Sequence, residues 1–130
     1  SRMGRDKALC EIDGVRLIDR VIMRLRPQVS RILISGSHDY GAGYEAVSDS
    51  VKGPRGPCAG VFALSRRLAA EAIGFLTAPV DAPFLPDDLA ARLVGQTSAV
   101  AVSGGALQPT FAWWVIAEVE QAARKLEGEE

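Results

Sequence analysis

The first residues of the chain have side chains suited to binding phosphate. The sequence begins SRMGRDKAL, which places Arg2, Gly4 and Lys7 close together. Arginine and lysine neutralise phosphate charge, and glycine lets the backbone approach a ligand closely. Taken alone, this stretch is equally consistent with a frayed basic terminus.

Two carboxylates lie where an α/β sheet binds its ligands. Asp49 ends the short candidate strand EAVSD, and Asp81 follows the apolar run IGFLTAPV. Ligands of such sheets bind beyond the carboxyl ends of strands, a rule that also points to Ser35 at the end of RILIS. The simpler alternative for Asp81 is a turn residue whose carboxylate accepts backbone N–H groups. Asp49 has the weaker context of the two.

The stretch KGPRGPCAG is a predicted loop between these strand ends. It contains three glycines and two prolines in nine residues, and both residue types interrupt regular structure. Gly56, Pro57 and Gly60 either shape a ligand-binding loop or serve a turn and the start of the next helix, and the two roles do not conflict.

The rest of the pattern alternates between amphipathic helices and short apolar strands. The predicted helices are 17–25, 61–72, 85–93 and 115–126. The predicted strands are 31–35, 45–49, 73–78, 98–103 and 110–115. Such alternation predicts an α/β fold in one domain over 1–130, with a Rossmann-like, mostly parallel sheet and helices on both faces. The strand 73–78 is apolar without alternation, so we expect it in the middle of the sheet, with Asp49 and Asp81 opening onto one cleft.

Composition excludes several classes of protein. Of the 130 residues, 48% are hydrophobic and 24% are charged, which argues against disorder. A net charge of −1 gives no global field to attract nucleic acid. The two cysteines and one histidine are too few for a zinc site, and Cys10 and Cys58 are best explained as reduced thiols. No apolar run reaches the length of a membrane span, so a cytoplasmic protein is expected.

The beginning of the chain leads to a further expectation. A phosphate-binding loop in an α/β sheet follows a strand, and no strand precedes Ser1. We therefore expect an apolar strand and a glycine pair upstream, and the first strand and a C-terminal segment of the fold to be missing from the chain as it stands.

Several motifs together resemble one enzyme family. SRMGRDKAL is similar to the second half of the nucleotidyltransferase motif LAGGxSxRMGxDKxL, and IDGVRLIDRVIMRL is similar to the segment that follows it. GPCAG resembles the GPLAG loop, and FLTAPVDAPFLPDDLAARL resembles the pcDtPfl segment with its helix. Their order and spacing resemble the molybdenum cofactor guanylyltransferases over nearly the whole chain. The GPxAG loop together with Asp81-Ala82-Pro83 is the more specific part.

The resemblance implies a function and roles for the residues above. Family members transfer GMP from GTP to the terminal phosphate of molybdenum-bearing molybdopterin, release pyrophosphate and use Mg²⁺. By similarity, Lys7 and Asp81 would be catalytic and Asp81 would hold Mg²⁺. The residues implied to bind nucleotide are Arg2, Gly4, Lys7, Ser35, Asp49, Gly56, Pro57, Gly60 and Asp81. A phosphate nucleophile is already ionised at neutral pH, so alignment and charge neutralisation matter more than a strong base.

Three departures from the family pattern qualify this implication. The LAGG half of the first motif is not in the chain, and Ser35 stands where asparagine is common near the base. Gln108-Pro109 stands where His-Pro is frequent near the pterin. We therefore expect the chain as it stands to be too incomplete for activity.

Two other functions stay open. One is a related nucleotidyltransferase that uses CTP or another phosphorylated acceptor, and the other is a nucleotidyltransferase-like domain that binds a partner without catalysis. The expected partners are GTP and a molybdopterin-type substrate, with no nucleic acid or membrane. Contacts with other molybdenum cofactor proteins are left open.

Overall fold

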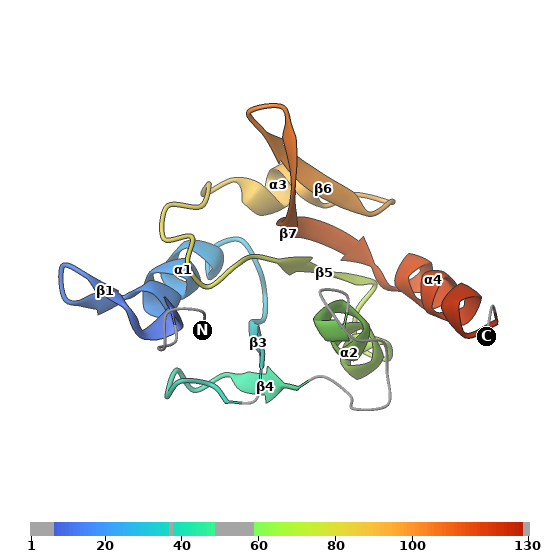
Figure 1. The fold of residues 1–130 in the computed structure, drawn as a ribbon, viewed down its shortest axis with the longest axis horizontal. Coiled ribbons are helices and arrows are strands. Elements are labelled where there is room, and N and C mark those ends of the chain that lie inside the picture. Colours follow the sequence, from blue (N-terminus) through green and yellow to red (C-terminus); the bar gives the residue numbers. More distant parts are fainter. Residues whose placement is uncertain (1–6, 37, 49–58, 129–130) are drawn as a thin grey trace.

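In the described part of the chain, four α-helices pack against short β-strands (Figure 1). The computed structural model describes residues 7–36, 38–48 and 59–128. The helices are α1 (Leu17–Leu25), α2 (Ala59–Leu68), α3 (Leu89–Leu93) and α4 (Ile116–Gly128), and a 3₁₀ turn, η1, covers Lys7–Leu9. None of the helices in these ranges is long and apolar enough to cross a bilayer.

Within the described ranges, seven strands form three separate hydrogen-bonded sheets. The strands are β1 (Glu11–Ile12), β2 (Val15–Arg16), β3 (Leu33–Ser35), β4 (Glu45–Val47), β5 (Gly74–Thr77), β6 (Ala99–Ser103) and β7 (Ala106–Val115). β1 and β2 form an antiparallel hairpin, β3 pairs with β4 in parallel, and β5 and β6 flank β7 in an antiparallel sheet. The α/β class is confirmed.

The strand pairing corrects two details of the expected sheet. Among the described ladders, β3 with β4 is the parallel pair, whereas a mostly parallel sheet was expected. β5 was expected in the middle, but it lies at an edge of its ladder, and β7 occupies the centre. Phe75 of β5 is nevertheless buried, and the other three residues of the strand are half-buried.

Helices lie on both faces of the strands. On β5, Phe75 packs with Leu64 and Leu68 of α2, whereas the next residue, Leu76, packs with Val21 of α1 and with α3. Successive strand side chains point to opposite faces, so α2 lies on one face and α1 and α3 lie on the other. Figure 1 shows β5 between α3 and α2. The predicted two-sided covering is therefore confirmed.

A cluster of ion pairs joins β4 to the end of α2. Arg67 on α2 binds the carboxylates of Glu45 and Glu71 through its side-chain nitrogens, and Arg31 lies 2.7 Å from Glu71 and 3.4 Å from Glu45. The hydrogen bond from Arg67 lowers the pKa of Glu45. Hydrogen bonds from Arg31 and then Arg67 lower the pKa of Glu71.

This cluster predicts sensitivity to acid. A carboxylate with a lowered folded-state pKa stabilises the fold above its unfolded pKa of about 4.3, and the stabilisation is lost as pH falls through the folded value. At pH values below about 4.3, the melting temperature of the protein is expected to decrease as the pH falls. This decrease should be less steep in Glu71→Gln, which lacks one of the two carboxylates. Glu120→Gln, which changes an α4 carboxylate outside the cluster, is the control and should keep the wild-type slope. Equal slopes in all three proteins would contradict this role.

Candidate functional site

The residues that neighbour the predicted site gather on one hydrophobic cluster. Ala8, fully buried, packs with Ile18 and Ile22 of α1 and with Ile34 of β3, and Val80 packs against the same cluster. Lys7 precedes Ala8, Ser35 follows Ile34, and Asp81 follows Val80 in the sequence. The start of the described chain, the end of β3 and the turn after β5 therefore meet at one edge of the fold.

Local structure presents Lys7 to solvent. The η1 turn is closed by a hydrogen bond from the Cys10 N–H to the Lys7 carbonyl, at 3.1 Å. Burial of Ala8 fixes this turn against α1 and leaves the Lys7 side chain 52% exposed. Cys10 forms no disulfide within the described residues, and Cys58 lies outside them.

Lys7 and Asp81 form an exposed ion pair. The Lys7 Nζ lies 3.7 Å from the Asp81 Oδ2, and the Asp81 side chain is 41% exposed. An ion pair this exposed contributes only about 0–1 kcal/mol to stability. Each group can therefore give up this ion pair at little cost and bind a ligand instead. The ammonium is suited to phosphate and the carboxylate to a metal ion.

Ser35 and Gly60 are the other described residues of the predicted site. Ser35 is exposed at the carboxyl end of β3, next to Gly36, whose N–H donates to the Val47 carbonyl at 2.9 Å. Gly60 is the second residue of α2 and is half-buried. Arg2, Gly4, Asp49, Gly56 and Pro57 lie outside the described ranges, as does the expected shared cleft of Asp49 and Asp81.

The donor set at Asp81 fits Mg²⁺ in one specific way. In the part of the chain that the structure describes, no three histidine, cysteine or acidic side chains gather into a metal-binding group. Mg²⁺ in nucleotide-using enzymes is commonly held by one or two carboxylates together with substrate phosphates and water. One exposed carboxylate beside a lysine fits that arrangement, in which the nucleotide supplies the remaining ligands.

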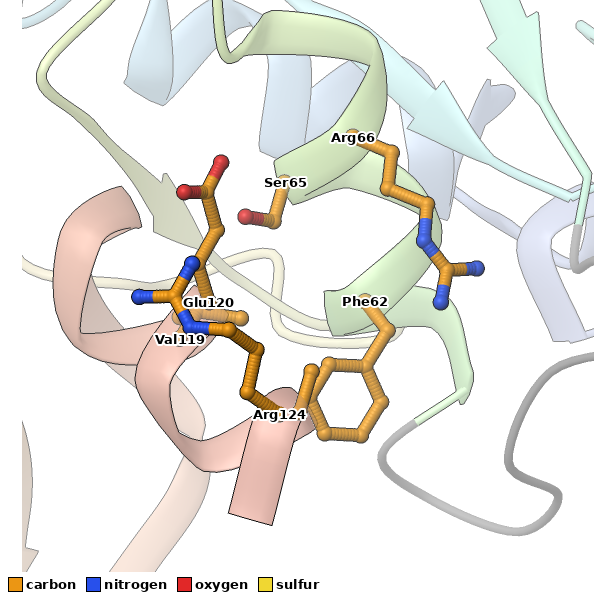
Figure 2. Close-up of a pocket in the computed structure, with 7 residues that line it drawn as sticks. Phe62, Ser65, Arg66, Val119, Glu120 and Arg124 are labelled. Atoms are coloured by element: carbon orange, nitrogen blue, oxygen red, sulfur yellow. The ribbon is translucent and has the colours of Figure 1, made fainter. Parts of the chain in front are cut away.

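A hollow between α2 and α4 lies apart from this site (Figure 2). It measures about 240 Å³, and its lining residues are Phe62, Ser65, Arg66, Val119, Glu120, Ala123 and Arg124. Figure 2 shows Ser65 pointing toward the Glu120 side chain of α4. Because its lining comes from α2 and α4 and includes neither Lys7 nor Asp81, it is not the candidate site.

The whole chain matches a family of nucleotidyltransferases. Residues 1–130 match the family model described as the MobA-like NTP transferase domain. The chain is 45% identical to the molybdenum cofactor guanylyltransferase of Sinorhizobium fredii over 129 residues, which is 90% of this chain and 59% of that protein. The protein of the same name from Rhizobium meliloti is 43% identical, with the same coverage. The one from Cereibacter sphaeroides is 41% identical, over 92% of this chain and 65% of that protein.

A solved structure supports the same fold. The chain superimposes on molybdopterin-guanine dinucleotide biosynthesis protein A from Archaeoglobus fulgidus with a TM-score of 0.65 and 20% identity. The match covers 95% of this chain and 68% of that one. The chain spans about three fifths of the length of the relatives from Sinorhizobium fredii and Rhizobium meliloti. From the family match over its full length, the chain belongs to the MobA-like NTP transferase domain family.

Proposed function

We propose that the protein transfers GMP from GTP to the terminal phosphate of molybdenum-bearing molybdopterin. The observation that carries the proposal is the exposed pair of Lys7 in η1 and Asp81 in the turn after β5, 3.7 Å apart, in a nucleotidyltransferase fold. The names of the relatives supply the base and the acceptor, since they are molybdenum cofactor guanylyltransferases.

In the proposed reaction, an acceptor phosphate oxygen attacks the α-phosphorus of GTP. A new P–O bond forms, the bond to the β-phosphate oxygen breaks, and pyrophosphate leaves with that electron pair. Mg²⁺ would supply neutralisation of charge on the phosphates. The Asp81 carboxylate would hold the metal ion, and the Lys7 ammonium would bind the phosphates and balance the charge that builds up there.

The remaining nucleotide contacts are part of the same proposal. Arg2 and Gly4 would contact the triphosphate together with Lys7. Ser35 and Asp49 would form part of the wall of the guanosine-binding site. Gly56, Pro57 and Gly60 would shape the loop and helix start next to the nucleotide. Ser35 carries a hydroxyl where an amide is common in the family, which leaves CTP as the alternative nucleotide.

Titration of the intact protein with nucleotides tests the choice of base. With Mg²⁺ present, GTP is expected to bind at least tenfold more tightly than CTP, measured by isothermal titration calorimetry. ATP is the control for contacts that involve the triphosphate alone. Tighter binding of CTP than of GTP would overturn the guanylyl assignment in favour of a cytidylyl one. Binding of neither nucleotide would favour a non-catalytic domain.

A further inference from the structure

Gln28 joins the end of α1 to the segment that follows the Asp81 turn. Its side-chain Nε2 donates to the carbonyl of Arg24 and to that of Pro86, each at 3.0 Å. Its Oε1 accepts the backbone N–H of Ala90 at 2.8 Å. One half-buried amide thus satisfies three backbone groups, two of which belong to residues about sixty positions later in the sequence.

The contact with Ala90 replaces a missing cap on α3. The first N–H groups of a helix lack partners within the helix, and the N-cap side chain commonly supplies one. Asp88, the N-cap residue of α3, makes no such hydrogen bond, and its carboxylate pairs with Arg92 instead. Gln28, in the segment that follows α1, supplies the acceptor instead and so fixes where this five-residue helix begins.

The turn that carries Asp81 is therefore held at both ends. At its near end, Thr77 pairs with Ala112 in the β5–β7 ladder. At its far end, Leu85 is 2% exposed in a cluster with Val21 of α1, and Gln28 binds the next residue along. Asp81 lies between these two anchors, so its position depends on both.

We infer that Gln28 is a positioning residue for Asp81. By binding Pro86 and Ala90 to the end of α1, it fixes the far end of the turn that presents the Asp81 carboxylate beside Lys7. The inference rests on the proposed function of Asp81 and adds to it a residue that touches neither nucleotide nor acceptor. Partners that orient a metal-binding group commonly change metal affinity or activity by 10–100-fold when they are removed.

Gln28→Met in the intact protein tests the inference, because methionine has similar length and makes none of the three hydrogen bonds. Turnover is expected to fall by about 10–100-fold, with little change in the KM for GTP. Electron paramagnetic resonance of Mn²⁺ added to the GTP complex should show Mn²⁺ binding weakened to a similar degree. Gln121→Met makes the same chemical change at an exposed position of α4 and should leave turnover and Mn²⁺ binding unchanged.

A double-mutant cycle with Asp81→Asn separates positioning from general stability. If Gln28 acts through Asp81, adding Gln28→Met to Asp81→Asn causes no further loss of turnover. The inference would be overturned if the double variant lost turnover by the product of the two single losses. Unchanged Mn²⁺ binding in Gln28→Met would overturn it as well. Normal turnover of Asp81→Asn alone would instead overturn the proposed function. Should Gln28→Met fail to fold, Gln28→Asn, one methylene shorter, takes its place in the same cycle with the same two criteria.

Discussion

Replacing Asp81 with asparagine is expected to lower turnover by about 10²–10³, with little change in melting temperature. The carboxylate would act on charge that develops mainly in the transition state, and loss of one such electrostatic contact costs about that much. The side chain is exposed and nearly isosteric with asparagine, and its ion pair with Lys7 adds little to stability. GTP binding should weaken only modestly, because in the proposed site Lys7 would still contact the phosphates.

The alternative role for Asp81 predicts the opposite pattern. A turn residue that satisfies backbone N–H groups would lose about 0.5–2 kcal/mol of stability when replaced, as in the loss of a helix cap, and turnover would survive. Mg²⁺-dependent pyrophosphate release and thermal melting, measured on the same sample, decide between the two. Asp87→Asn, exposed in the same segment, is the matched control and should leave both unchanged. A variant that melts early and turns over normally would remove Asp81 from the catalytic site.

Gly74→Ala is expected to destabilise the fold by about 1–3 kcal/mol or more. A Cβ on Gly74 would lie 2.4 Å from the Trp114 carbonyl oxygen and 2.6 Å from the Trp113 ring, both shorter than real contacts allow. Neither tryptophan can move away easily, because both belong to β7, and all four residues of β5 pair with β7. The Trp113 N–H also donates to the Gly95 carbonyl at 2.9 Å.

Thermal or urea unfolding of two variants measures this effect. Gly95→Ala is the matched control, because a Cβ there meets nothing within 4 Å, and it should melt close to the wild type. A Gly74→Ala protein as stable as Gly95→Ala would show that β5 and β7 do not pair as described.

The sequence predicted which segments are buried better than how the strands pair. The helix at 17–25 was predicted with its observed bounds, because its apolar face and Pro27 are local signals. The pairing of β5 with β7 is not local. It joins residues 74–77 to residues 112–115, which lie far apart in the sequence. β7 also begins at Ala106, four residues before the predicted strand, because Gly104 and Gly105, with φ values of 58° and 81°, turn the chain from β6 into β7. The spacing of apolar residues along the chain does not reveal which strand will pair with which.

The site shows the same division. The strand-end rule and the family resemblance both indicated Asp81, and the structure places it beside Lys7. Gln28 was not predicted, since a single glutamine after a helix-ending proline carries no signal in the sequence. Its partners become visible only when α1 and α3 pack together around Val21, Leu85 and Leu89.

Transfer of label from GTP to the acceptor tests the central claim most directly. The intact protein would be incubated with GTP labelled at the α-phosphate, molybdenum-bearing molybdopterin and Mg²⁺, and the products separated by chromatography. The account predicts label in a dinucleotide, pyrophosphate in equal amount, and loss of both when Asp81 is replaced by asparagine. Label that stays in GTP, or that enters the dinucleotide equally well in Asp81→Asn, would contradict it.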